Sequence, residues 1–257
     1  MEAAALFFVK GGIRMNYVMA DIHGCFREYM QLMEKLTLRE EDTLFVLGDA
    51  MDRGEEPIRV IQDLMERQNV IYILGNHDAM MLGALKPLME EITEESVASL
   101  DADALLAFRV WIEKHGANTF AQFRKLPRPV QQDILFYLAE ASLYEAVEHG
   151  GSLYVLVHAG LSNFDVKREI SDYEAEELIW ERPDYGKNYF PGSRIFLVTG
   201  HTPTPMIRRD GKPLIYAENG HIAIDCGCVF GGCLAAYCIE TGEAYYVERE
   251  AERDPLD

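Results

Sequence analysis

The sequence predicts an α/β protein, and three features of the chain support that fold class. Apolar segments of strand length occur at residues 17–20, 43–47 and 70–74, and each is followed by a short polar motif. Segments with apolar residues at helical spacing separate these strands. A strand-rich region begins at Leu153 and continues to about residue 247. Alternating strands and helices of this length predict parallel pairing, with the helices packed on the sheet.

The first two helices are expected directly after the first two motifs. The first has apolar side chains at helical spacing, at Phe26, Tyr29, Met30, Met33 and Leu36. Pro57 suits the first turn of the second helix, because its missing N–H would have no helical partner there. The apolar stripe of this second helix consists of Ile58, Ile61, Leu64 and Met65. Both stripes predict helices with one buried face.

Residues 79 to about 145 interrupt this alternation with a mostly helical insert. Its expected packing positions are Met80, Met81, Leu85, Leu88, Leu105, Phe108, Trp111 and Ile112. Two interpretations of the insert remain open. It either completes the hydrophobic core or also walls a site above the strand ends, where loops and inserts often carry specificity.

The region from residue 153 predicts a second sheet packed on the first. Its expected strands span residues 153–157, 195–200, 221–229, 234–239 and 244–247. No Pro/Gly/Ser-rich linker divides the chain, so residues 15–257 are expected to form a single domain. Residues 1–14 lack the basic start and the cleavage site of a secretory signal, and Met15 stands directly before the first motif strand. They are interpreted as an N-terminal extension or an upstream start, without an assigned role.

The charge balance of the 257-residue chain limits its partners. There are 43 acidic and 24 basic residues, which give a formal net charge of -19. Phosphate backbones are held mainly by Lys and Arg, so nucleic acid is not an expected partner. No apolar run reaches the roughly 20 residues needed to cross a bilayer, and no membrane partner is expected. We expect a soluble, cytoplasmic protein.

The chain has five cysteines, and an odd number without an export signal fits a reducing cytosol. They are Cys25, Cys226, Cys228, Cys233 and Cys238. Cys226 and Cys228 share one face of an expected strand, where they could form a thiolate metal site or a redox pair. Burial as small apolar residues is the simpler interpretation, and zinc-finger spacing is absent.

Five polar motifs, each at the end of an expected strand, carry the chemistry. They are DIHG at residues 21–24, GDAMDRG at 48–54, GNHD at 75–78, and the segments that begin at His158 and Gly200. Open α/β sheets place their binding sites at such strand ends, so we expect the five motifs to meet. A lone Asp or His in this position is more often a cap or a structural group; the ordered set is what indicates a site.

The ordered set DxHG, GDxxDRG, GNHD, HAGL and GHTP resembles the calcineurin-like metallophosphoesterases, and within them the bacterial and phage-type serine/threonine protein phosphatases. The resemblance covers roughly residues 15 to 240. It implies a four-layer α-β-β-α sandwich with a helical insert and with metals at one end. Ala20 stands where the family usually has Gly, and Asp78 where the eukaryotic phosphatases usually have Glu. Neither departure removes an expected ligand.

The resemblance also implies two divalent metal ions. The six implied ligands are Asp21 and His23 for the first ion, Asp49 as the bridge, and Asn76, His158 and His201 for the second. Imidazole with carboxylate suits manganese, iron or zinc better than calcium, and manganese is our expectation. Two ions about 3.5–4 Å apart lower the pKa of a bridging water and neutralise charge, so that a hydroxide attacks phosphorus in line.

The same resemblance implies roles in the reaction for residues beside the ligands. His77 is expected to point away from Asn76 and to protonate the leaving oxygen, oriented by Asp52. Arg53 can bind two phosphate oxygens at once, and Asn76 also faces the phosphate. Arg182, in a Trp-x-Arg segment, is a second candidate for the phosphate; its simpler interpretation is a surface ion pair. The histidines outside the motifs, interpreted as ordinary, are His115, His149 and His221.

These residues favour a metal-dependent phosphomonoesterase, foremost a serine/threonine protein phosphatase, acting on a phosphorylated protein or a small phosphoester. The alternative is a symmetrical dinucleoside polyphosphate (diadenosine tetraphosphate) hydrolase with the same metal centre. Those enzymes, as the family is known, usually carry Ala at the position of Asp52. Asp52 therefore favours ester cleavage, because an alcohol leaving group needs the proton more. A catalytically silent metal-binding module is a third reading, but no expected ligand is missing.

Overall fold

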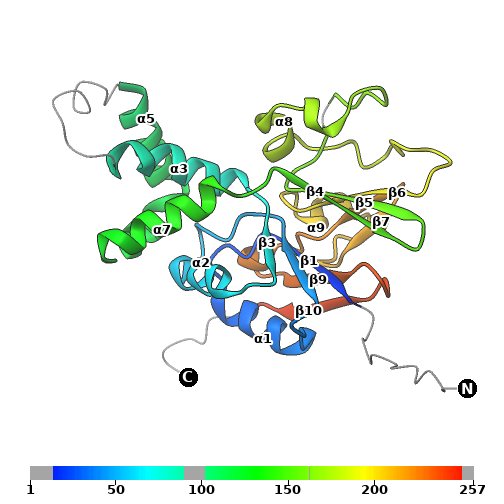
Figure 1. Cartoon of the computed structure of the whole chain (residues 1–257), viewed down its shortest axis with the longest axis horizontal. Coiled ribbons are helices and arrows are strands. Elements are labelled where there is room, and N and C mark those ends of the chain that lie inside the picture. Colours follow the sequence, from blue (N-terminus) through cyan, green and yellow to red (C-terminus); the bar gives the residue numbers. More distant parts are fainter. Residues whose placement is uncertain (1–13, 90–101, 162, 251–257) are drawn as a thin grey trace, which may run out of the picture.

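Two five-stranded mixed sheets form the centre of the computed structural model, which describes residues 14–89, 102–161 and 163–250 (Figure 1). The first sheet has the order β10-β9-β1-β2-β3. Its strands are β1 (Asn16–Met19), β2 (Thr43–Val46), β3 (Val70–Tyr72), β9 (Cys233–Cys238) and β10 (Ala244–Glu248). The second sheet has the order β4-β5-β6-β8-β7. Its strands are β4 (Tyr144–His149), β5 (Ser152–Val157), β6 (Ile195–Thr199), β7 (Tyr216–Glu218) and β8 (His221–Ala223).

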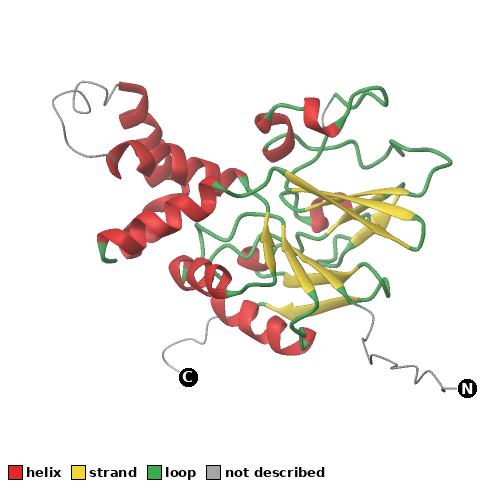
Figure 2. Ribbon diagram, viewed as in Figure 1, coloured by secondary structure: helices red, strands yellow, loops and turns green. Residues whose placement is uncertain are grey.

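Helices flank the two sheets (Figure 2). On the first sheet these are α1 (Phe26–Leu36) and α2 (Pro57–Glu66). The helices beside the second sheet are short: α8 (Ala175–Ile179) and α9 (Thr204–Ile207). The described part of the insert contains α3 (Asn76–Met89), α5 (Ala102–Trp111), a π-helical turn (Ile112–Gly116), α6 (Ala117–Phe123) and α7 (Arg128–Ala139). The expected sandwich of two sheets flanked by helices is confirmed.

Alternation along the strands of the first sheet divides the core into two layers. Val18 and Phe45 face the second sheet and pack with Leu156 and other apolar residues of that sheet. Their neighbours Met19 and Val46 face the opposite way, into the cluster formed with α1 and α2. Successive side chains of a strand point to opposite faces, so strands that are apolar on both faces must be covered on both sides. The expected parallel pairing of β1 with β2 and of β2 with β3 is confirmed.

The two helices after the first two motifs occur where the sequence predicts them. Tyr29 and Leu32 of α1 and Ile61 and Leu64 of α2 are fully buried in the same cluster. The second helix begins at Pro57, as expected. The apolar stripes therefore anchor both helices to the sheet, which fixes the loops that precede them.

The strands near the end of the chain differ from the expectation. We expected residues 234–239 and 244–247 in the second sheet, but β9 pairs antiparallel with β1 and adds β10 to the first sheet. The expected strand over residues 221–229 is also wrong in extent. It ends at Ala223, and Gly227 adopts a left-handed φ of 69° before a short 3-10 helix, Cys228–Phe230. Cys226 and Cys228 therefore do not share a strand face.

The helical segment lies beside the carboxyl end of β3 (Figure 1). Trp111 is buried within it, whereas Leu105 is 53% exposed, so the packing role expected for Leu105 is wrong. Residues 1–13 of the expected extension, residues 90–101 and the side chain of Leu88 lie outside the described residues. No helix within the described ranges is long and apolar enough to cross a membrane.

Candidate metal centre and active site

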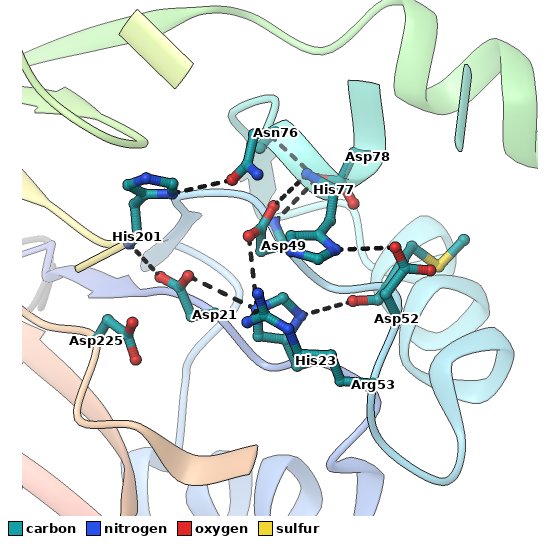
Figure 3. Close-up of polar contacts among 12 residues, drawn as sticks. Asp21, His23, Asp49, Asp52, Arg53, Asn76, His77, Asp78, His201 and Asp225 are labelled. Carbon is teal, nitrogen blue, oxygen red and sulfur yellow. Dashed lines mark hydrogen bonds and ion pairs between the residues drawn. The ribbon is translucent and has the colours of Figure 1, made fainter. Parts of the chain in front are cut away.

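The five motifs meet: residues of four of them lie together in Figure 3, and His158 of the fifth lies 3.5 Å from Asp49 Oδ2. Asp21 and Asp49 follow β1 and β2, Asn76 begins α3, and His158 and His201 follow β5 and β6. Nine non-glycine residues of the described ranges have positive φ, and six of them are expected site residues: Asp21, His23, Asp49, Asp52, Arg53 and His201. Left-handed backbone is sparsely populated by such residues and costs on the order of 1–3 kcal/mol each when it persists. The loops are therefore held in shapes that the surrounding sheets impose.

Glycine permits the close approach of the second and third motif loops. A Cβ on Gly75 would lie 2.2 Å from Asp49 Oδ1 and 2.4 Å from the Asp49 backbone nitrogen. Asp78 joins the same loops, because its Oδ2 accepts hydrogen bonds from the backbone N–H groups of Asp49 (2.9 Å) and Gly75 (3.1 Å). Burial and the charge of Asp49 raise the pKa of Asp78 to about 7. The residue that departs from the eukaryotic pattern thus has a structural task here.

Asp49 lies between two sets of imidazoles. Its Oδ2 is 3.5 Å from His23 Nε2 and 3.5 Å from His158 Nε2. Two groups of potential ligand atoms, each within 4.8 Å of one another, share this carboxylate: His23 with Asp49 and His77, and Asp49 with His158 and His201. Burial opposes the ionisation of Asp49, but the imidazoles around it leave the pKa of its carboxyl below the ordinary value. A shared carboxylate between two such groups could bridge two cations.

Backbone carbonyls fix which nitrogen of two histidines faces this centre. His23 Nδ1 lies 2.8 Å from Met51 O, and His158 Nδ1 lies 2.6 Å from Leu47 O. A carbonyl only accepts, so Nδ1 carries the proton in each ring and Nε2 keeps a free electron pair. Burial lowers the pKa of both imidazoles, that of His23 to about 3. Neutral rings with an oriented Nε2 are what a metal ion needs.

Asn76 completes the side of the centre next to the second sheet. Its Oδ1 lies 2.9 Å from His158 Nε2 and 3.0 Å from His201 Nδ1. Burial lowers the pKa of His201 to about 3. The structure thus brings one amide oxygen and two imidazoles together, as a second metal position would require.

Asp225 is a further acidic group at the centre, and the sequence analysis missed it. The residue is buried and lies beside Asp21 (Figure 3). Burial, followed by the charge of Asp225, raises the pKa of Asp21 well above its ordinary value, and burial raises the pKa of Asp225 to about 7. Buried carboxylates of like charge are costly without a compensating cation. This cluster of oxygen and nitrogen donors fits divalent metal ions.

His77 points away from Asn76 and toward Asp52. The distance between His77 Nδ1 and Asp52 Oδ2 is 2.9 Å, and both side chains are buried. Asp52 is itself held by two residues of the helical insert: Trp111 Nε1 donates to its Oδ2 (2.9 Å) and Thr119 Oγ1 donates to its Oδ1 (2.8 Å). The backbone N–H of Asp52 also donates to Thr119 Oγ1 (3.1 Å). We call Trp111 and Thr119 the Asp52 clamp.

The insert holds Asp52 through Trp111 and Thr119, but none of the described residues in 79–145 lines the cavity beside the candidate metal ligands, so a wall formed by the insert stays a prediction. A Cβ on Gly116 would lie 2.1 Å from the Trp111 ring, so the π-helical turn needs glycine to seat the indole. His115, from the same turn, contacts the His77 ring with centroids 4.7 Å apart. We interpreted His115 as an ordinary histidine, but the structure places it against His77.

Two arginines and several apolar side chains surround a cavity of about 500 Å³ beside the metal centre. Arg53 Nη1 lies 2.7 Å from His23 Nε2, and its guanidinium lies 5.1 Å from the centroid of the Phe230 ring. Arg182 Nε donates to Thr202 Oγ1 (3.1 Å) and lines the same cavity. Phe230 and Met206 line it as well, with exposed fractions of 65% and 74%. The cavity thus has a polar half with the candidate ligands and an apolar half.

The five cysteines are free and buried. Burial raises the pKa of Cys226 to about 12. Cys228 lies near Cys25 and Glu28 rather than pairing with Cys226, and Arg249 Nη1 donates to Glu28 Oε2 at 2.8 Å. The simpler interpretation of the cysteines, as buried small residues, agrees with this arrangement.

The residues that the sequence analysis missed differ in how they could have been found. Asp225 follows the apolar residues 222–224 as the motif residues follow their strands, so the same signal was present. Trp111 and Thr119 lie 59 and 67 positions after Asp52 in the sequence. No local sequence pattern predicts contacts between residues so far apart in the chain.

Comparison with known proteins identifies the relatives of this chain. A family model described as calcineurin-like phosphoesterase matches residues 17–231. The asymmetrical bis(5'-nucleosyl)-tetraphosphatase PrpE of Anoxybacillus flavithermus is 30% identical over 247 residues, 85% of this chain and 88% of the relative. The symmetrical bis(5'-nucleosyl)-tetraphosphatase of Haemophilus ducreyi is 28% identical over 174 residues, 66% of this chain and 54% of the relative. This chain thus spans about half of that second relative.

A solved structure supports the fold. A protein serine/threonine phosphatase from Saccharomyces cerevisiae matches with a TM-score of 0.58 at 14% identity, over 94% of this chain and 81% of that chain. This likeness shows the fold alone. Both curated relatives are named for the hydrolysis of dinucleoside tetraphosphates, which favours the alternative reading of the sequence over the protein phosphatase.

Proposed function

The chain belongs to the calcineurin-like phosphoesterase family, whose members hydrolyse phosphoesters, and on that premise we propose that it hydrolyses dinucleoside tetraphosphates. The observation that carries the proposal is the apolar half of the cavity. Phe230 and Met206 are among the most exposed large apolar side chains of the described residues, and both lie beside the candidate metal ligands. A phosphate group does not bind to apolar side chains, whereas a nucleobase stacks on an aromatic side chain.

We also propose that cleavage is asymmetrical. Coverage does not separate the two kinds, because the asymmetrical relative is matched over 88% of its length and a symmetrical relative from Pseudomonas putida over 91%; the identity is 30% for the former and 25% for the latter. Asp52, which the symmetrical enzymes usually replace with Ala, supports the same choice. Asymmetrical cleavage of diadenosine tetraphosphate gives ATP and AMP, whereas symmetrical cleavage gives two molecules of ADP.

The proposed roles of the residues follow from their positions. Asp21, His23, Asp49, Asn76, His158 and His201 would hold two divalent ions, with Asp225 as an additional acidic group. Such ions, when bound, activate water and neutralise phosphate charge. Arg53 and Arg182 bind phosphate oxygens. His77, held through Nδ1 by Asp52, presents Nε2 to the cavity and protonates the leaving oxygen.

A second candidate function is the hydrolysis of phosphoserine or phosphothreonine in proteins. The observation that favours it is the buried contact between His77 Nδ1 and Asp52 Oδ2 at 2.9 Å. A general acid of this kind helps an alcohol leaving group more than a nucleotide, because the nucleotide phosphate is a weaker base and leaves more readily without a proton. The apolar wall beside the metals is the reason for ranking this function second.

The two functions are separated by one competition of substrates. Manganese-loaded protein is supplied with diadenosine tetraphosphate and with a phosphoserine peptide, and the products are resolved by anion-exchange chromatography. We expect kcat/KM to be higher for the dinucleotide and the products to be ATP and AMP. A higher kcat/KM for the peptide would replace the proposal with the second candidate. Production of ADP alone would refute the asymmetrical cleavage but retain the substrate.

A further inference from the structure

A second cavity adjoins the active-site cavity at Arg182. It has a volume of about 690 Å³, within the range of about 300–1,000 Å³ that is typical of small-molecule sites. Arg182 lines both cavities. The other residues that shape the second cavity include Phe164, Val166, Lys187, Asn188 and Tyr189. None of the candidate metal ligands lines it, so among the described residues this cavity is suited to binding rather than to reaction.

The second cavity combines a rigid apolar wall with hydrogen-bonding groups. Phe164 stacks on Tyr189 with ring centroids 4.5 Å apart and nearly parallel planes. Val166 is 75% exposed at the cavity, which leaves an apolar surface without cover. The Asn188 carboxamide oxygen accepts from the Phe190 backbone N–H (2.9 Å), and its NH₂ group can donate to the edge of a base. An apolar wall with an amide at its side suits a nucleobase better than a phosphate.

Positive charge lies between the two apolar surfaces. Arg182 is anchored by its hydrogen bond to Thr202, the residue after the candidate ligand His201. Lys187, also at the second cavity, is paired with Asp184 at 3.1 Å, whereas Arg182 has no ion pair with any described residue and lies on the path between the cavities. An elongated ligand with apolar ends and a polyanionic middle matches this order of apolar, cationic and apolar surfaces.

We infer that the second cavity binds the distal nucleoside of the dinucleoside tetraphosphate, while the proximal base lies on Phe230 and Met206. This inference rests on the proposed function. Three candidate ligands, Asp49, Asn76 and His201, line the first cavity and none lines the second, so the two bases lie at unequal distances from the reacting phosphate. With this placement, the phosphate that is bonded to the proximal nucleoside lies at the metal centre. The rest of the polyphosphate passes Arg182. The geometry therefore agrees with asymmetrical cleavage.

The test is Val166→Asp, measured with substrates that have two bases, one base or none. These are diadenosine tetraphosphate, adenosine 5'-tetraphosphate and p-nitrophenyl phosphate. Val166 is exposed, so the substitution does not disturb the core. We expect kcat/KM for the dinucleotide to fall about tenfold, equivalent to about 1.4 kcal/mol, and the values for the other two substrates to remain unchanged. Phe136→Asp, at an exposed position of α7 outside both cavities, is the matched control and should change none.

Each other outcome is decisive. Equal losses for the dinucleotide and adenosine tetraphosphate would show general repulsion of polyanions and overturn the distal site. An unchanged dinucleotide value would overturn it too. A wild type that hydrolyses p-nitrophenyl phosphate but neither nucleotide would instead refute the proposed function itself.

Discussion

Replacement of Thr119 by Val should weaken the reaction through Asp52 without touching a metal ligand. Valine keeps the shape of threonine but removes the hydroxyl, which donates to Asp52 Oδ1 at 2.8 Å and accepts from the Asp52 N–H at 3.1 Å. Both residues are fully buried, so water does not replace the lost partner. A hydrogen bond to a charged group contributes about 1.5–3 kcal/mol, and we expect the free energy of unfolding to fall by about that amount.

The effect on catalysis should depend on the leaving group. Asp52 keeps its contacts with His77 and Trp111 through Oδ2. The general acid His77 is therefore still present but is held less firmly in position. We expect kcat to fall about tenfold for an alkyl phosphate, below the roughly 10²–10⁴-fold that complete loss of a general acid costs. For p-nitrophenyl phosphate, whose leaving group needs little protonation, kcat should change less.

The assay compares kcat for both substrates in wild type, Thr119→Val and Thr43→Val. Thr43 is also buried, and its hydroxyl accepts from Arg14 at the opposite end of β2, so this control loses stability without affecting the site. Equal losses of kcat for the alkyl and aryl substrates in Thr119→Val would refute the reasoning, because a positioning role acts through the proton delivered to the leaving group.

Four further predictions concern the metals, the acid, the phosphate and the buried carboxylate. Chelation should abolish hydrolysis of p-nitrophenyl phosphate and manganese should restore it; full activity in protein shown to be metal-free would contradict this. His77→Asn should retain two metal equivalents by elemental analysis while lowering kcat by roughly 10²–10⁴ for a poor leaving group, and loss of one equivalent would make His77 a ligand. Arg53→Ala should raise KM and lower kcat, and Arg182→Ala should do so to a smaller extent. Unchanged kinetics in either variant would show that the replaced arginine does not bind the phosphate. Asp225→Asn should raise the Tm of metal-free protein more at about pH 8 than at about pH 5, because a carboxyl whose folded pKa is raised to about 7 loses its stabilising contribution as pH rises through that value; an equal Tm change at both pH values would argue against it.

The sequence predicts the first half of the fold well because local signals decide it. The stripe from Phe26 to Leu36 and the proline at position 57 mark α1 and α2, and both occur as expected. The placement of β9 could not be predicted in the same way, since an apolar strand can pair with either sheet. Its antiparallel pairing with β1 depends on the tertiary arrangement.

The candidate site divides along the same line. Motif residues such as Asp49 and His158 are recognisable because each follows a strand and belongs to an ordered set. Residues from other parts of the chain that hold a motif residue in place, such as Trp111, which donates to Asp52, have no local sequence signal. His115 illustrates the limit: only the π-helical turn brings its ring against His77.

The left-handed backbone of the site residues has a consequence for how this chain can evolve. Glycine adopts positive φ without strain, so replacement of Asp21 by glycine would relieve both backbone strain and a buried carboxyl whose ionisation the fold opposes in the metal-free chain. Most mutations destabilise a protein, but sites that serve function are an exception, and their loss can stabilise the fold. Selection for activity, rather than for a stable fold, is therefore what retains these residues. A lineage released from that selection should lose its metal centre early while the two sheets persist.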